Sequence, residues 1–129
     1  MELDYIENIN GFDEHVVRLY NFDKTEAIKL RDLIKETVIE KRQKLNLAEV
    51  DFIEPRNCNL IFGLFKSDEG ILTKDSETFF CVLTLNGFNT MLKLIEPYCN
   101  KDSRSYQYLY DIDNPTELLF CPSATSYEE

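Results

Sequence analysis

Residues 58–85 read CNLIFGLFKSDEGILTKDSETFFCVLTL and hold the strongest strand signal in the chain. Residues 58–66 and residues 78–85 are apolar at nearly every position, which is typical of strands buried on both faces. Between them, residues 67–70 (SDEG) are a turn signature. We therefore predict two core strands joined as a β-hairpin with an elaborated tip. Gly63, in the middle of the first strand, indicates a bulge or a close backbone approach.

Two amphipathic helices lie on either side of this stretch in the sequence. Residues 24–44 predict a long helix that begins after Asp23, a residue type suited to cap a helix. Its apolar stripe is expected to consist of Ala27, Leu30, Ile34, Val38 and Leu45. A second helix is predicted over residues 86–96, with Asn86 as its cap and Pro97 ending or bending it.

Shorter apolar runs complete the order of elements. Residues 16–22 predict an interior strand, and residues 47–54 predict a short strand that ends before a proline. The last two strands are expected over residues 106–112 and 117–121, joined by a turn at residues 113–115. The order is therefore β-α-β-β-β-α-β-β.

This order predicts an α+β fold, a two-layer sandwich in which both helices cover one face of a mostly antiparallel sheet of five or six strands. A right-handed parallel crossover between the first two strands would make the sheet mixed. The chain of 129 residues is expected to form a single domain. Residues 1–14 are expected to be an acidic N-terminal arm or a first helical turn, and residues 123–129 a frayed tail.

The charge of the chain limits the classes of partner. Lysine and arginine number 14, aspartate and glutamate number 24, and the net charge is −10 at pH 7. Such a surface repels phosphate backbones, so nucleic-acid binding is not expected. No stretch approaches ~18 apolar residues, and the N-terminal residues do not form a signal peptide. We therefore expect a cytoplasmic protein that does not bind membranes.

The cysteines show no spacing typical of a metal or redox site. Each of them lies beside apolar residues, and the four are Cys58, Cys81, Cys99 and Cys121. This pattern favours buried free thiols. Two disulfides are the alternative, and they would require a secretory route.

Groups suited to catalysis or metal binding are few. His15, the only histidine, is expected on the surface at the edge of a strand. Four oxygen-bearing side chains fall within seven residues, namely Asp111, Asp113, Asn114 and Glu117. They do not match the pattern of a calcium-binding EF-hand loop, so a hairpin turn closed by an Asx-type hydrogen bond is favoured over a cation site. We expect no catalytic site, no metal and no cofactor.

The tyrosines of residues 106–110 are the most suggestive feature for binding. Tyr106, Tyr108 and Tyr110 share parity, so in a strand their rings would stand on one face. Exposed beside Asp111 and Asp113, these rings would form an anchor surface for a protein partner. Under a helix, they would be ordinary core residues.

The sequence thus favours a non-enzymatic, acidic protein-binding or regulatory module. One version is an immunity-type or antagonist protein that binds a basic partner by charge steering. The first alternative is a small-ligand-binding or enzymatic domain with a pocket between the sheet and the helices. The second is a structural homo-oligomer, such as a homodimer paired through a strand edge or the tyrosine face. No motif in the chain carries a resemblance to a known family.

Overall fold

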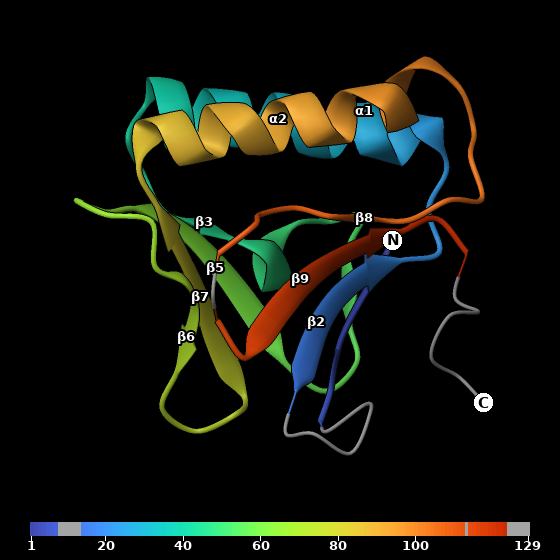
Figure 1. The fold of residues 1–129 in the computed structure, drawn as a ribbon. Helices are drawn as coiled ribbons and strands as arrows, with labels where there is room; N and C mark the ends of the chain where they lie inside the picture. Colours follow the sequence, from blue (N-terminus) through green and yellow to red (C-terminus); the bar gives the residue numbers. More distant parts are fainter. Residues whose placement is uncertain (8–13, 113, 124–129) are drawn as a thin grey trace.

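The computed structural model describes residues 1–7, 14–112 and 114–123. Within them, two helices form an upper layer and nine strands lie beneath it (Figure 1). The helices are α1 (Lys24–Leu33), continued by a π-helical segment (Ile34–Glu40), and α2 (Leu85–Asn100). The strands are β1 (Glu2–Ile6), β2 (His15–Tyr20), β3 (Leu45–Asn46), β4 (Glu54–Pro55), β5 (Asn59–Leu64), β6 (Gly70–Thr73), β7 (Thr78–Leu83), β8 (Gln107–Tyr108) and β9 (Thr116–Cys121). The predicted α+β class, with two helices on one side of the strands, is confirmed.

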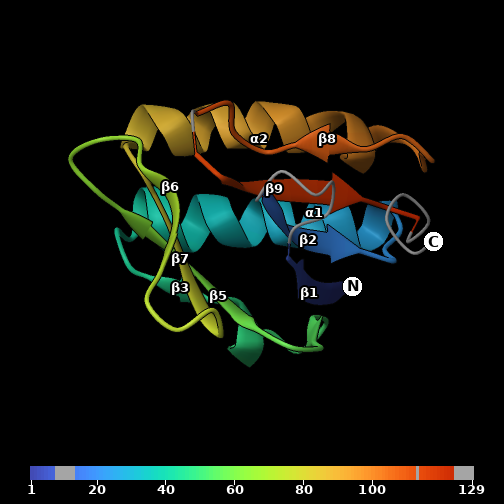
Figure 2. The same cartoon turned by 60° about the horizontal axis from the view of Figure 1, so that its bottom comes forward.

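The strands are divided between two sheets, where the sequence predicted one. A five-stranded sheet has the order β4-β1-β2-β9-β8, and a four-stranded sheet has the order β3-β5-β7-β6. Both sheets are mixed, because β2 pairs parallel with β9 and β5 pairs parallel with β7. Figure 2 shows β1 and β2 on one side of the strand layer and β5, β6 and β7 on the other. The two sheets and both helices share one core.

The predicted hairpin of residues 58–85 is wrong in its pairing. The apolar pair within its tip, Ile71 and Leu72, belongs to a strand of its own, β6, which pairs antiparallel with β7. Asp75 closes the turn between β6 and β7, where its carboxylate accepts the N–H groups of Glu77 and Thr78, each at 2.9 Å. Strand β7 therefore pairs with β6 on one side, and it pairs with β5 on the other. The β5–β7 register is continuous through Gly63, so there is no bulge at this residue.

Helix α1 and its continuation have the expected apolar stripe as far as Val38, but they end earlier than predicted, so that Leu45 lies in β3. Its stripe is fully buried, at 0% exposure for Ala27, Leu30, Ile34 and Val38. Residues 37–39 (TVI) are β-branched, and the π-helical hydrogen bonds occur in this part of the helix. The helix stops at Glu40, and Arg42 takes a positive φ of 58° before the chain enters β3.

Helix α2 begins earlier and ends later than predicted. Thr84, not Asn86, is the cap, and its Oγ1 accepts the N–H of Gly87 at 3.0 Å. The helix continues through Pro97 because its last turn is anchored by Tyr98, whose buried ring lies 5.1 Å from that of Phe120. Tyr98 and Phe120 are distant in the sequence, so local helix propensity does not reveal this contact.

The N-terminal residues are part of the sheet, so the arm expected over residues 1–14 is wrong where the structure describes it. Strand β1 lies between β2 and β4, and Leu3 is fully buried. Strand β2 is an interior strand, as predicted. The strand predicted over residues 47–54 is replaced by a 3₁₀ turn (Leu47–Glu49) and the short β4. Residues 124–129, which hold most of the predicted tail, lie outside the described residues.

Candidate functional site

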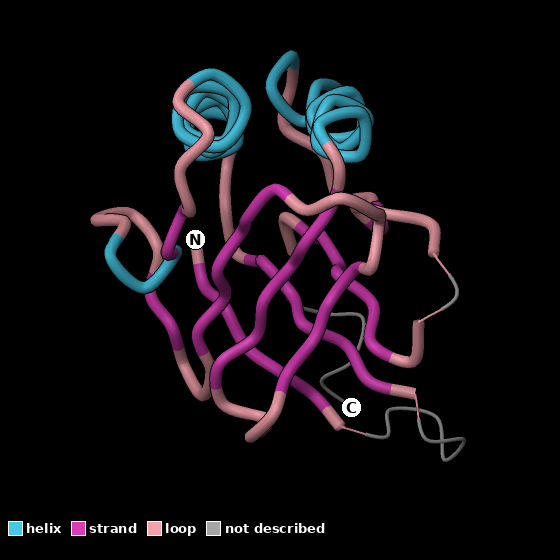
Figure 3. The backbone as a smooth tube through the Cα atoms, turned by 90° about the vertical axis from the view of Figure 1, so that its left-hand side faces the viewer, coloured by secondary structure: helices cyan, strands magenta, loops and turns pink. Residues whose placement is uncertain are grey.

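The outer face of the four-stranded sheet is apolar and uncovered. Successive side chains of a strand point to opposite faces, so Leu60, Phe62, Phe79 and Cys81 point inward and are fully buried. Ile61, Phe80 and Val82 point outward, away from the core. Figure 3 views the molecule from this side, with both helices above the strands. No helix of the described residues covers this face.

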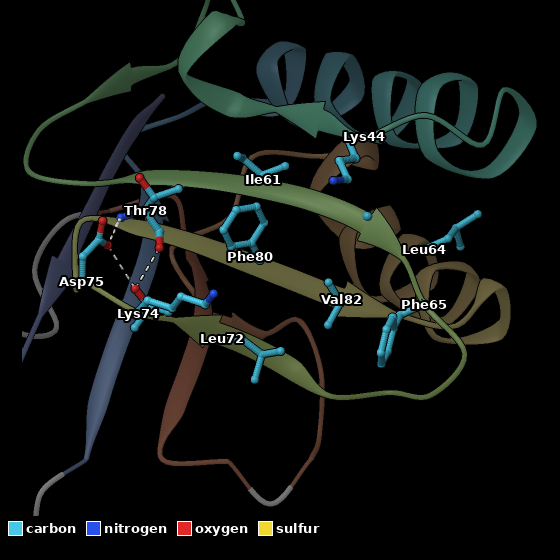
Figure 4. A pocket seen from close by; sticks show the side chains of 12 residues that line it. Lys44, Ile61, Leu64, Phe65, Leu72, Lys74, Asp75, Thr78, Phe80 and Val82 are labelled. Atoms are coloured by element: carbon cyan, nitrogen blue, oxygen red, sulfur yellow. Dashed lines mark hydrogen bonds between the residues drawn. The ribbon is translucent and has the colours of Figure 1, made fainter.

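The outward side chains line a groove with a volume of about 750 Å³. Ile61, Phe80 and Val82 form its floor, together with Gly63, whose missing side chain deepens it. Lys44 lies on the β3 side of this floor, and Leu72 and Lys74 lie on the β6 side (Figure 4). We call this surface the sheet groove.

The sheet groove gathers most of the strongly exposed apolar side chains. Among the described residues, five large hydrophobic side chains are exposed, and three of them line the groove. These are Phe65 at 46%, Leu72 at 46% and Phe80 at 38%. Exposed apolar side chains that gather in one place, rather than singly, are a feature of many interaction sites on folded domains. The sequence indicated this surface only indirectly, because strands that are apolar on both faces need a cover on both faces.

The charged groups at the sheet groove are two lysines and one aspartate. Neither Lys44 nor Lys74 forms an ion pair within the described parts of the chain. The Asp75 carboxylate is held by the backbone N–H groups of Thr78 and Glu77, and these hydrogen bonds lower its pKa. The groove is therefore apolar, with Lys44 at one margin and Lys74 beside the Asp75 carboxylate at the other, on a chain whose net charge is −10.

Side chains occupy the edge of the sheet at Ile71, next to the groove. The N–H of Ile71 in β6 donates to Tyr110 Oη at 3.2 Å, and the Ile71 carbonyl accepts Asn114 Nδ2 at 3.1 Å. Tyr110 Oη in turn donates to the Thr116 carbonyl, which ties β6 to β9. Gly70 has a φ of 78°, and a Cβ there would lie 3.0 Å from the Tyr110 ring. A partner strand therefore finds the backbone groups of Ile71 already occupied.

The three tyrosines predicted to share a face do so only in part, because the rings of Tyr106 and Tyr108 lie 5.9 Å apart while Tyr110 lies elsewhere. Tyr106 is 52% exposed, Tyr108 is half-buried, and Tyr110 packs against the main core. Tyr108 packs instead against a second, smaller cluster formed by Val16, Tyr20, Leu119 and Cys121. Tyr110 does not join them because β8 contains only Gln107 and Tyr108, so the chain has left the strand before Tyr110.

The acidic residues near these tyrosines differ in their exposure to solvent. Asp111 is exposed, and Asp113 lies outside the described residues. Partial burial raises the pKa of Glu117, and the charges of Glu14 and Asp111 add to this effect. Asn114 Oδ1 accepts the Thr116 N–H at 2.8 Å, which is the Asx-type turn predicted for this hairpin. No group of three metal-ligating side chains occurs among the described residues.

The cysteines and the histidine do not converge on a reactive centre. All four cysteines are free and buried, as predicted. Burial raises the pKa of Cys58 to about 12, and it also raises the pKa of Cys81 and of Cys99. His15 opens β2 and is half-buried, with its ring 6.0 Å from that of Tyr5. The residues that line the sheet groove include neither a histidine nor a cysteine.

Comparison with known proteins identifies no family. No family model matches the chain, and no solved structure matches it. The chain is 29% identical over 97 residues to a UPF0754 membrane protein of Microcystis aeruginosa. These residues are 74% of this chain but only 22% of that protein, so the chain spans less than a quarter of its relative. In the described part of this chain, neither helix is long and apolar enough to cross a membrane.

Proposed function

We propose that this chain is a non-enzymatic, cytoplasmic protein-binding module whose docking surface is the sheet groove. One observation carries the proposal: Phe65, Leu72 and Phe80 are strongly exposed on a sheet that is otherwise well packed. Covering such side chains contributes about 1 kcal/mol each, since roughly half of each remains to be buried. The supporting chemical argument is that the groove offers apolar surface and lysines, without a paired acid and base or a nucleophilic thiol.

The test compares partner capture by three forms of the protein. The double variant Leu72→Ser/Phe80→Ser removes two exposed apolar side chains from the groove, while Tyr106→Ser removes an exposed ring elsewhere. Each form is immobilised on a resin and incubated with a lysate of the organism that encodes the chain. The captured proteins are then quantified by mass spectrometry. We expect a stoichiometric partner for the wild type and for Tyr106→Ser, and its loss for the double variant. Circular dichroism checks that each variant is folded.

A basic partner that docks at Tyr106, Tyr108 and the exposed Asp111 is the second candidate. The exposed Tyr106 ring, together with the net charge of −10, favours it. This candidate predicts a partner that is lost in Tyr106→Ser and retained in the groove variant, with an association rate that falls as salt rises. That outcome would contradict the sheet groove as the docking surface.

A further inference from the structure

The sheet groove has two chemical characters that together describe its occupant. Its floor is formed by Ile61, Phe80 and Val82, and no polar side chain interrupts these three. Its margins carry Lys44 toward one edge of the sheet and Lys74 toward the other. Lys44 directly precedes β3 and Lys74 directly follows β6, and these are the two edge strands of the sheet, so the two lysines lie on opposite sides of the apolar floor. An occupant that matches these two ammonium groups is apolar in the middle and anionic on both sides, while the Asp75 carboxylate, next to Lys74, is held by the backbone N–H groups of its own turn.

An amphipathic helix has this distribution of side chains. Its apolar stripe is about 100° wide and is bordered on both sides by polar positions. A sheet face commonly buries its apolar side chains against such a helix. An added strand is a poorer occupant, because Tyr110 and Asn114 already take up the backbone groups of Ile71 at the β6 edge. The face of the sheet is open, whereas this part of its edge is closed.

The protein's own helices cannot supply this occupant to a second copy. The stripe of α1 and its continuation, from Ala27 to Val38, is buried in the core. The stripe of α2 is also buried, through Phe88, Met91 and Ile95. No helix of the described residues therefore has an apolar stripe left to place in the groove of another copy.

We propose that the sheet groove binds one amphipathic helix of a partner protein, with aspartate or glutamate along both sides of its apolar stripe. This inference rests on the proposed function and adds the chemistry of the partner. The stripe lies on Ile61, Phe80 and Val82, and the flanking carboxylates face Lys44 and Lys74. The acidic character of the chain as a whole opposes such a partner at long range, so recognition depends on these two local charges.

The test uses two synthetic helical peptides that differ only in charge. Both are amphipathic helices of about 18 residues with a leucine stripe, long enough for five turns. One carries glutamate on both flanks, and the other carries lysine at the same positions. Binding to the full chain is measured by fluorescence anisotropy, and backbone amide shifts in NMR locate the site. We expect the glutamate peptide to bind at least tenfold more tightly and to shift amides of β5, β6 and β7.

Matched variants separate the charge from the apolar floor. Lys44→Gln/Lys74→Gln is expected to weaken the glutamate peptide about fivefold, the size of two exposed ion pairs. The control Lys93→Gln/Lys101→Gln removes the same charge from α2 and its C-terminal end, where both lysines are exposed, and is expected to leave binding unchanged. Leu72→Ser/Phe80→Ser is expected to abolish binding of the glutamate peptide.

The remaining outcomes overturn the inference in distinguishable ways. Equal binding of both peptides, lost in Leu72→Ser/Phe80→Ser, would reject the acidic helix and leave the docking surface intact. Binding of neither peptide at about 1 mM would reject the helix as the occupant. If light scattering then shows a dimer that Leu72→Ser/Phe80→Ser dissociates, the groove is covered by a second copy. If the natural partner is captured equally by wild type and groove variant, the proposed function fails as well.

Discussion

Gly87 shows how a single position depends on a contact that is distant in sequence. Asp68, in the loop before β6, accepts the N–H of Thr84 at 2.7 Å and its hydroxyl at 2.8 Å. A Cβ on Gly87 would lie 2.5 Å from the Asp68 carboxylate, so the carboxylate fits only because residue 87 lacks a side chain. Gly63 differs, since a Cβ there would meet only Lys44 Cγ, at 3.6 Å.

Substitution of the two glycines is therefore expected to change stability in opposite directions. Gly87→Ala displaces Asp68 from the start of α2 and should lower the free energy of unfolding by about 1–2 kcal/mol. Gly63→Ala has room and restricts the unfolded chain, so stability should be unchanged or higher by up to about 1 kcal/mol. Urea denaturation measures both. A larger loss in Gly63→Ala than in Gly87→Ala would show that the space around the glycines has been misread.

A second prediction concerns the buried ion pair on the outer face of the five-stranded sheet. Arg18 is only 4% exposed and bonds Asp4 through Nε at 2.7 Å and Nη2 at 2.9 Å, with its guanidinium 4.2 Å from the centre of the Tyr20 ring. Asp4→Asn leaves this buried charge poorly matched and should cost about 2–3 kcal/mol of stability. Arg56→Gln breaks pairs at the surface and should cost clearly less. Thermal and urea unfolding of both variants provide the comparison.

At the scale of the elements, local patterns in the sequence predict both helices and the longer buried strands, but not β1, β6 or the short length of β8. The α1 stripe, the interior strand β2 and the final β8–β9 hairpin follow from patterns within a few residues. The pairing of strands depends on contacts between distant residues, such as Asp68 with Thr84. For this reason the sequence predicts β5 and β7 as strands but not that they are parallel.

For the candidate site, too, the sequence predicts local features but not which of them the fold brings together. The alternation of residues 59–64 and 78–83 shows which side chains share a face, but not which face the rest of the chain covers. The tyrosine surface was expected from parity alone, and parity requires a strand that continues through Tyr110. Strand β8 is too short for that, because the chain turns so that the Tyr110 hydroxyl reaches Ile71.

Tyr110 provides the prediction that belongs to this scale. Its hydroxyl joins the β6 edge to β9, so Tyr110→Phe leaves the Ile71 N–H and the Thr116 carbonyl without this partner. We expect stability to fall by about 1–2 kcal/mol and hydrogen exchange at the Ile71 amide to accelerate more than at other amides of β6 and β7. Tyr106→Phe, at an exposed ring, is the control. Unchanged exchange at Ile71 would contradict the role of the hydroxyl.

For the whole molecule, the buried thiols report on the core that the two sheets and the helices share. Cys58, Cys81 and Cys99 lie in this core, while Cys121 lies in the smaller cluster on the outer face of the five-stranded sheet. Burial raises the pKa of Cys58 to about 12, so at pH 8 this group is almost entirely protonated and unreactive. Raising the pH toward 12 increases the thiolate fraction, so native reactivity grows only at strongly alkaline pH.

We therefore expect none of the four thiols to react with Ellman's reagent at pH 8 in the native protein. In urea, all four should react, with a labelling rate that follows global unfolding. Rapid labelling of one cysteine without denaturant, located by mass spectrometry, would show that its part of the core opens separately.

The closed edge at β6 has a consequence for the protein in concentrated solution. A domain with a solvent-exposed apolar sheet face is at risk of forming fibrils. Fibrils grow when the unpaired backbone N–H and C=O groups of an edge strand pair with a strand of the next molecule. Here the Tyr110 hydroxyl and the Asn114 amide occupy the backbone groups of Ile71 and so interrupt that ladder at the β6 edge. Growth of a fibril by addition of a strand at Ile71 is therefore blocked, while the outer face of the sheet stays uncovered.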